Sequence, residues 1–266
     1  MKNAYEIRDL RVTLGGSEIL RGIDLNIPEG RTTVIVGANG SGKSTLLRSI
    51  SRLQRREGEI LLRGREVSSI SPREYAREVA LLPQAPEAPE NLSTIDLVSR
   101  GRDPHRRWWD QWSKHDETIV WDALRATGLT EFAERPLGTL SGGQRQRAWI
   151  ALALAQSPSV LLLDEPTTYL DVAYQLDVLE TVTTLQRERG ITVVMVLHDL
   201  GMAARFSDHL VAMREGQVAA VGDTDTTLST TVIKDVFGID SVLLSDPRTG
   251  RPVIVPHRAH ESMEAR

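Results

Sequence analysis

Apolar and polar residues alternate in two segments near the N-terminus. The alternation covers residues 10–14 and 23–27, and Pro28-Glu29-Gly30 ends the second segment. A period of two is typical of a β-strand with one buried face and one exposed face. We therefore expect an antiparallel sheet at the start of the chain.

Four short runs follow a different pattern, because they are continuous stretches of apolar and β-branched residues. They occupy residues 32–36, 79–82, 160–163 and 191–197, and residues 59–62 are predicted as a further strand. A continuous apolar run is typical of a parallel strand that is covered on both faces. These runs predict an α/β fold.

Helical spacing is clearest where apolar residues recur every three or four positions between residues 172 and 185. Gly190 ends this pattern, as glycine commonly does after a helix. Further helices are expected over residues 94–100, 114–127 and 148–155.

Two hairpins are predicted in the last quarter of the chain. The first covers residues 209–221 around the Glu215-Gly216 turn, and the second lies within residues 239–255. Residues 258–266 are polar, and we expect them to be disordered.

The composition restricts the possible functions. The chain has 266 residues, a net charge of −4 and 40% hydrophobic residues, enough for a full core. It has no cysteine, which excludes disulfides, thiolate metal sites and thiol redox chemistry. No segment reaches the roughly 18 apolar residues of a membrane span, and the acidic balance argues against broad nucleic-acid binding.

The strand at 32–36 leads into the sequence GANGSGKST, which fits the P-loop pattern and precedes a helical stretch with apolar residues at 46, 47, 50 and 53. In such a loop the backbone amides cradle the β-phosphate and the lysine neutralises β and γ oxygens. The alternative is a glycine-rich turn. The predicted nucleotide-binding residues are Gly37, Asn39, Gly40, Ser41, Gly42, Lys43, Ser44 and Thr45, with Thr45 at the α-phosphate and the Ser44 hydroxyl as a ligand of Mg²⁺.

A pair of carboxylates, Asp164 and Glu165, follows the apolar strand at 160–163. The carboxyl ends of parallel strands border the ligand crevice of α/β sheets, so Asp164 is placed to hold Mg²⁺. Glu165 is then beside the γ-phosphate, where it can orient or deprotonate the attacking water. A solvated strand end is the alternative.

Two further polar residues stand at strand ends. Gln84 follows the strand at 79–82 and can offer its carbonyl oxygen to a metal, although by itself it is an ordinary loop residue. His198 follows the strand at 191–197 and can hydrogen-bond a γ-phosphate oxygen, although a lone histidine is more often structural.

The sequence LSGGQRQRA at 140–148 places two glycines at the start of a helix. Ser141 is a good N-cap, which would leave the amides of Gly142, Gly143 and Gln144 as unsatisfied donors that face an anion. On these residues alone, a phosphate-binding helix end and an ordinary capped helix are equally acceptable.

Residues 102–112 concentrate arginines and three of the five tryptophans. This composition fits either a docking surface or the core of a helix pair with a charged rim.

Taken in order, the motifs GANGSGKST, PQ, LSGGQRQRA, VLLLDEP and YLD and the strand-end His198 resemble the nucleotide-binding subunits of ABC transporters. The resemblance covers nearly the whole chain, and LSGGQ shortly before the second carboxylate strand is specific to ABC ATPases. It implies ATP hydrolysis, with Lys43, Gln84, Glu165 and His198 as catalytic residues and with Gln84 also a metal ligand beside Ser44 and Asp164.

The same resemblance implies a head-to-tail dimer with ATP between two copies of the chain. Ser141, Gly143 and Gln144 would then serve the nucleotide held by the partner's Lys43, and Asp171 would lie at the dimer seam. The implied fold is a P-loop NTPase core with a mostly parallel sheet and an antiparallel N-terminal sheet, plus an inserted helical subdomain. The expected boundaries are 1–87 and 159–238 for the core, 88–158 for the helical subdomain, and 239–266 for a hairpin and flexible tail.

Within the superfamily, SRGRDPHRRWWDQWSKHD, QRQRAWIALALAQ and EPTTYLDVAYQLDVLE resemble the importers of ferric siderophores, with haem and cobalamin importers as close relatives. The implied assembly lies at the cytoplasmic face of the inner membrane. Two copies of this peripheral subunit bind two permeases, with a substrate-binding protein outside and a permease helix in a groove of the helical subdomain. Leu14 stands where an aromatic residue usually stacks on adenine, and Gly201 stands where asparagine is expected.

Other functions predict different features. A haem, cobalamin or other nutrient importer would differ only in its permease. A soluble ABC clamp on nucleic acid or ribosomes commonly has tandem cassettes or long arms, which this sequence does not show. A P-loop kinase for small molecules leaves LSGGQ and His198 unexplained.

Overall fold

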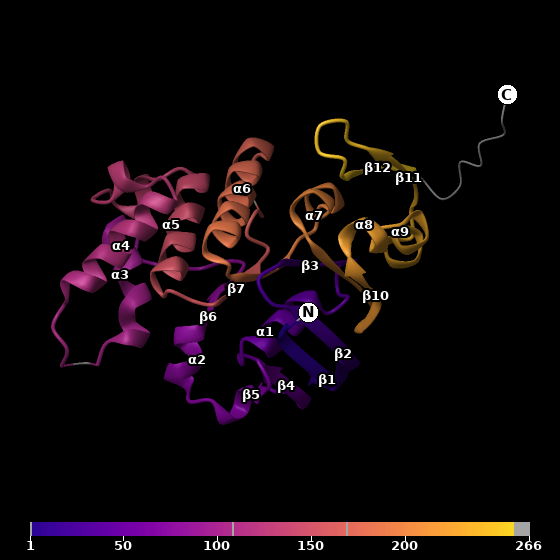
Figure 1. Ribbon diagram of the computed structural model, residues 1–266, viewed down its shortest axis with the longest axis horizontal. Coiled ribbons are helices and arrows are strands. Elements are labelled where there is room, and N and C mark those ends of the chain that lie inside the picture. The colour runs from indigo at the N-terminus through magenta and orange to yellow at the C-terminus, as the bar shows by residue number, and fades with distance from the viewer. Residues whose placement is uncertain (1, 108, 169, 258–266) are drawn as a thin grey trace. The chain divides into compact units, whose positions relative to one another are not determined.

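A computed structural model describes residues 2–107, 109–168 and 170–257 (Figure 1). The chain forms two compact units, each described here by itself. Unit 1 comprises Met1–Pro28, Thr32–Gly64 and Val196–Arg266, and unit 2 comprises Glu29–Arg31 and Arg65–Met195. Trp108, Tyr169 and the tail at 258–266, all part of the sequence predictions, lie outside the described residues.

Unit 1 contains the predicted antiparallel sheet. Its strands are β1 (Asn3–Leu14), β2 (Ser17–Pro28) and β4 (Glu57–Leu62), in the order β2-β1-β4. Burial alternates along β2 from Gly22 to Ile27, where Ile23, Leu25 and Ile27 are buried and the residues between them are exposed. The period-two pattern therefore predicted this sheet correctly.

The strand that leads into the P-loop, β3 (Thr32–Gly37), is buried at every position. It pairs parallel with β9 (His209–Arg214), and β9 forms the predicted hairpin with β10 (Gln217–Asp223). Helix α1 (Lys43–Ile50) follows the loop. The prediction that this helix extends to Leu53 was wrong, because α1 ends at Ile50 and Leu53 is 69% exposed.

The end of unit 1 combines short helices with the second predicted hairpin. The hairpin is formed by β11 (Asp240–Ser245) and β12 (Pro252–His257), and β12 lies against α7 (Leu200–Phe206) (Figure 1). The sequence patterns did not predict α7, α8 (Thr224–Thr227) or α9 (Thr230–Phe237). These helices are short, so each shows few helical periods.

Unit 2 contains the strands that carry the candidate carboxylates. β6 (Val79–Leu82) runs parallel to β7 (Val160–Asp164), and β7 neighbours β8 (Thr192–Val196). Every residue of β7 and β8 is buried, as the continuous apolar runs predicted. Helix α6 (Val172–Arg189) ends at Gly190, whose φ of 64° lies in the left-handed region that glycine tolerates.

Helices dominate the rest of unit 2, and α3, α4 and α5 pack against one another (Figure 1). The helical segment 88–158 is thus rich in helix, whereas its boundaries as a subdomain remain a prediction. The remaining elements are β5 (Arg65–Glu66), η1 (Val67–Ser69), α2 (Pro72–Glu78), α3 (Thr94–Ser99), η2 (Arg100–His105), α4 (Lys114–Ala126), η3 (Thr130–Phe132), η4 (Leu137–Thr139) and α5 (Gly142–Ala155).

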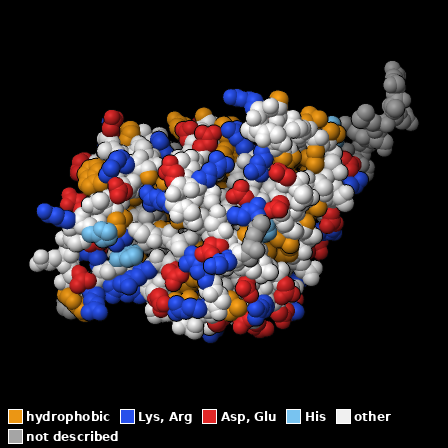
Figure 2. Space-filling view, in the orientation of Figure 1, with side chains coloured by type: hydrophobic (Ala, Val, Ile, Leu, Met, Phe, Trp, Pro, Cys, Tyr) orange, Lys and Arg blue, Asp and Glu red, His pale blue; other side chains and the backbone are white. Residues whose placement is uncertain are grey.

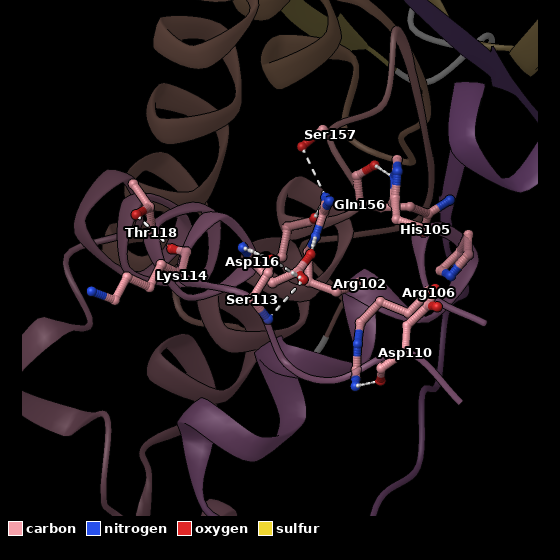
Figure 3. Close-up of polar contacts among 12 residues, drawn as sticks. Arg102, His105, Arg106, Asp110, Ser113, Lys114, Asp116, Thr118, Gln156 and Ser157 are labelled. Atoms are coloured by element: carbon pink, nitrogen blue, oxygen red, sulfur yellow. Dashed lines mark hydrogen bonds and ion pairs between the residues drawn. The ribbon is translucent and has the colours of Figure 1, made fainter. Parts of the chain in front are cut away.

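A buried ion pair connects η2 to α4 (Figure 3). Arg102 Nε donates to Asp116 Oδ1 over 2.9 Å, and the two side chains are only 4% and 10% exposed. The same guanidinium donates to Ala155 O at 2.8 Å, and Ser113 Oγ donates to Asp116 Oδ2 at 2.5 Å. Within segment 102–112, Arg102 therefore belongs to a helix-packing core.

The two described tryptophans of the same segment behave differently. Trp109 is 57% exposed and Trp112 is 41% exposed, and their rings lie under the guanidinium groups of Arg107 and Arg106. The core interpretation thus holds for Arg102 and fails for these two rings, because their neighbouring arginines cover them without burying them.

Charges of both signs are interspersed over the face shown in Figure 2, in keeping with the small net charge of −4. Within the described ranges, no helix is long and apolar enough to cross a membrane.

Candidate active site

The P-loop in unit 1 has the backbone geometry of an anion cradle. Gly42 is the N-cap of α1 with a φ of 98°, so the first turn of the helix opens toward the loop without a side-chain cap. A Cβ on Gly37 would lie 2.3 Å from Met213 O and 2.6 Å from Ser41 Oγ. Glycine is therefore required at position 37 by close packing.

Lys43 and Ser41 are both buried in this loop. Lys43 is 5% exposed, and its ammonium donates to Gly37 O at 2.9 Å and to Ala38 O at 3.0 Å. Ser41 is 4% exposed, and its hydroxyl is among the few buried polar groups without a hydrogen-bond partner in the described structure. A buried orphan hydroxyl beside a lysine fits a phosphate oxygen as its missing partner.

The other P-loop positions and His198 are more accessible. Asn39 and Gly40 are exposed, Ser44 and Thr45 are half-buried in the first turn of α1, and His198 is exposed after the end of β8. The predicted phosphate-binding residues of the P-loop, residues 37–45, thus lie on one loop and one helix end, whereas His198 lies on a separate segment.

The two candidate carboxylates in unit 2 have distinct environments. Asp164 is the last residue of β7 and is 1% exposed. Glu165 is 9% exposed and has a φ of 52°, a left-handed conformation that is uncommon for residues other than glycine. Such strained residues cluster at functional sites.

Two side chains hold the same oxygen of Glu165. Gln84 Nε2 donates to Glu165 Oε2 at 2.5 Å, although the residues are 81 positions apart in sequence. Thr168 Oγ1 donates to the same oxygen at 3.1 Å. The structure therefore brings two predicted residues together and adds Thr168, which the motif analysis missed. The sequence signal for this contact was a hydroxyl residue three positions after the carboxylate, in a turn that contains Pro166.

The three residues that the sequence predicts as metal ligands carry oxygen donors, which fit magnesium better than a softer metal. Gln84, Asp164 and Ser44 offer amide, carboxylate and hydroxyl oxygens, the hard ligands that Mg²⁺ prefers. No group of three or more His, Asp or Glu side chains that could form an all-protein metal cage occurs among the described residues. Mg²⁺ at phosphate sites typically uses one or two carboxylates and the phosphates themselves, so these residues fit it.

The LSGGQ segment starts helix α5 with a complete capping box. Gln144 N donates to Ser141 Oγ at 3.3 Å, and Ser141 N donates to Gln144 Oε1 at 3.0 Å. Ser141 is the N-cap, as predicted. The expectation that the Gln144 amide is an unsatisfied donor was wrong, because the cap itself uses that amide.

Gly143 is required by a neighbouring ring. A Cβ at this position would lie 2.7 Å from Tyr174 Cδ1, and Tyr174 is 40% exposed. The missing side chain thus allows α6 to pack on the start of α5. Asp171, the N-cap residue of α6, is exposed and makes no side-chain capping bond.

The order of motifs and the local geometry agree with a comparison of family sequences, in which residues 20–168 match the ABC transporter family. This match covers more than half of the chain. The chain belongs to the ABC transporter family. The predicted family and ATPase activity are thereby confirmed.

Relatives support this family assignment along nearly the whole chain. The petrobactin import ATP-binding protein FpuD of Bacillus anthracis is 45% identical, over 97% of this chain and 94% of the relative. The ferric enterobactin transport ATP-binding protein FepC of Escherichia coli is 42% identical, over 96% and 95%.

Solved structures of ABC proteins have the same fold. A metal-chelate type ABC transporter in an inward-facing conformation aligns with a TM-score of 0.84 and 26% identity, over 97% of this ABC chain and 98% of that one. The cassette MJ0796, dimeric and bound to ADP and phosphate, aligns with a TM-score of 0.70 and 28% identity, over 83% and 98%. The predicted P-loop NTPase fold is confirmed, and this ABC subunit binds ATP.

Proposed function

We propose that this chain is the ATP-hydrolysing subunit of an importer of ferric siderophores. The observation that carries the proposal is the identity of 42–45% to FepC and FpuD, which extends well outside the family match at 20–168. Both names specify siderophore transport. Identity above 40% to two siderophore transport proteins along nearly the whole chain supports a shared transport class.

The site residues divide the chemistry among them. The P-loop amides and Lys43 bind the phosphates, and the orphan Ser41 hydroxyl donates to a phosphate oxygen. Water attacks the γ-phosphorus, its proton passes to the Glu165 carboxylate, and the bond to the ADP oxygen breaks to release phosphate. His198 hydrogen-bonds a γ-phosphate oxygen, and Gln84 holds Glu165.

Mg²⁺ would be held by Ser44, Gln84 and Asp164. When bound, it neutralises phosphate charge. The position of Asp164 as the last residue of β7 supports this role, because the carboxyl ends of parallel strands border the ligand crevice of α/β sheets.

A second copy of the chain completes each site. Ser141, Gly143 and Gln144 serve the nucleotide on the partner's Lys43, and Asp171 lies at the seam. The capping box supports this role because it fixes the start of α5, and the exposed position of Asp171 supports contact with another chain. Binding of ATP at both sites closes the dimer, and hydrolysis returns it to the open state.

Permeases bind the helical part of unit 2, so the subunit works as a peripheral protein at the cytoplasmic face of the inner membrane. A cavity of about 250 Å³ supports this docking site, because aromatic and arginine side chains are enriched at protein interfaces and both kinds line it. Part of its lining follows Gln84 closely in sequence. Its lining residues are Pro86, Glu87, Ala88, Glu90, Leu137, Arg145 and Trp149.

Co-purification tests the transported substrate. The tagged chain should bring down a permease whose binding protein holds a ferric siderophore, and that ligand with its binding protein should stimulate ATP hydrolysis in vesicles. A binding protein that holds haem or cobalamin instead would contradict the siderophore proposal. Phosphate release without any phosphorylated acceptor excludes the kinase alternative.

A further inference from the structure

Thr168 forms two hydrogen bonds to Glu165 within the turn after β7. Thr168 N donates to Glu165 O at 3.3 Å, and Thr168 Oγ1 donates to Glu165 Oε2 at 3.1 Å. A carboxylate can only accept, so the hydroxyl is the donor. One residue therefore contacts both the backbone and the side chain of Glu165.

The two donors to Glu165 Oε2 come from different parts of unit 2. Gln84 is an exposed residue beyond the end of β6, whereas Thr168 is half-buried in the turn after β7. The Thr168 contact is local, spanning three residues, and the Gln84 contact spans 81. The local contact is thus maintained by the same turn that gives Glu165 its left-handed φ of 52°.

We propose that Thr168 is a positioning residue for ATP hydrolysis, which acts by fixing the plane of the Glu165 carboxylate. This inference rests on the proposed function, because it concerns the carboxylate assigned there as the base. A hydrogen bond to Oε2 sets the direction of the second oxygen, and the proton from the attacking water needs an acceptor in a defined direction. Thr168 lies in the same turn as Glu165, so its hydrogen bond to Oε2 does not depend on the loop that carries Gln84.

Removal of the hydroxyl tests this role. Thr168→Val should lower kcat for ATP about tenfold, as expected for one lost hydrogen bond to a charged group, with KM for ATP unchanged within about twofold. Thr168→Ser keeps the hydroxyl and should restore kcat. Thr167→Val is the matched control. Gln175 and Leu170 donate hydrogen bonds to the backbone oxygen of Thr167, which valine keeps, so this variant should retain wild-type kcat.

Three outcomes would overturn the inference: wild-type kcat in Thr168→Val, an equal loss in Thr168→Ser, or a rise in KM that accounts for the whole effect. Thermal unfolding and ATP binding identify a folding defect, in which case Thr168→Ala provides the same loss of hydroxyl. Glu165→Gln in the same series separates a failure of the proposed base from a failure of the inference about Thr168. If it hydrolyses ATP at the wild-type rate, the assignment of the base fails; if it is inactive while Thr168→Val is not impaired, only the present inference fails.

Discussion

Two carboxylates of unit 2 are held by hydrogen bonds in very different ways. Asp116 accepts from Arg102 and Ser113 inside a helix-packing core, on a residue with regular helical geometry. Glu165 accepts from Gln84 and Thr168 at the end of a strand, on a residue with a left-handed φ. A charged partner inside a core fixes a carboxylate for structure, whereas amide and hydroxyl donors at a strand end orient one for chemistry.

The pKa of Asp116 agrees with its structural role. Burial by itself would raise the pKa, but the hydrogen bonds from Ser113 and Arg102 and the Arg102 charge outweigh it and lower the pKa below the ordinary value of 3.8. Asp116 is therefore ionised in the folded protein at neutral pH.

The largest expected effect is on catalysis. If Glu165 is the base, Glu165→Gln should lower the rate of phosphate release at least about 100-fold while ATP binding is retained. The exposed Glu188→Gln on α6 controls for the loss of one negative charge. Phosphate release and equilibrium ATP binding are the two measurements. Wild-type turnover in Glu165→Gln would remove Glu165 from the mechanism.

The next effect is on stability. Arg102→Met should lower the free energy of unfolding by about 3–5 kcal/mol, because it leaves the buried Asp116 carboxylate without its charged partner. Arg125→Met is the matched control, since the Arg125–Asp122 pair on α4 is exposed and its loss should cost at most about 0.5 kcal/mol. Equal costs in urea unfolding would contradict the structural role of the buried pair.

The smallest effect is the pH dependence. Because the folded pKa of Asp116 is depressed, its contribution to stability is present above about pH 4 and is lost as pH falls through the folded pKa. Asp116→Asn should therefore lose less of its remaining stability than the wild type between about pH 5 and pH 3. Urea unfolding over this pH range compares the variant with the wild type, and an equal loss of stability in both proteins would contradict this role of Asp116.

The sequence predicted the elements with strong periodicity and the residues inside long motifs. The buried strands β3, β7 and β8, helix α6 and the Ser141 cap follow from local patterns, which tertiary contacts do not overrule here. The family resemblance then joined motifs that lie far apart in the chain.

Contacts between distant segments were not predictable in the same way. Nothing in the sequence pairs Arg102 with Asp116, and a docking surface was an open alternative for the segment around Arg102. Gly143 indicated access for a ligand, but its requirement also arises from the Tyr174 ring of α6. Leu53 matched helical spacing, yet α1 had already ended. These contacts and this helix end depend on how distant segments pack, which hydrophobic periodicity does not predict.

In the proposed dimer, Ser141 of one copy completes the nucleotide site on Lys43 of another. A mixture of Ser141→Arg and Lys43→Ala proteins tests it, because neither homodimer has an intact site, whereas a mixed dimer has one. Random pairing forms mixed dimers half of the time, so equal amounts should recover up to about a quarter of wild-type phosphate release. Ser141→Arg alone should bind ATP as a monomer nearly as the wild type does. If the mixture stays as inactive as each variant alone, Ser141 acts within its own chain and the shared site is contradicted.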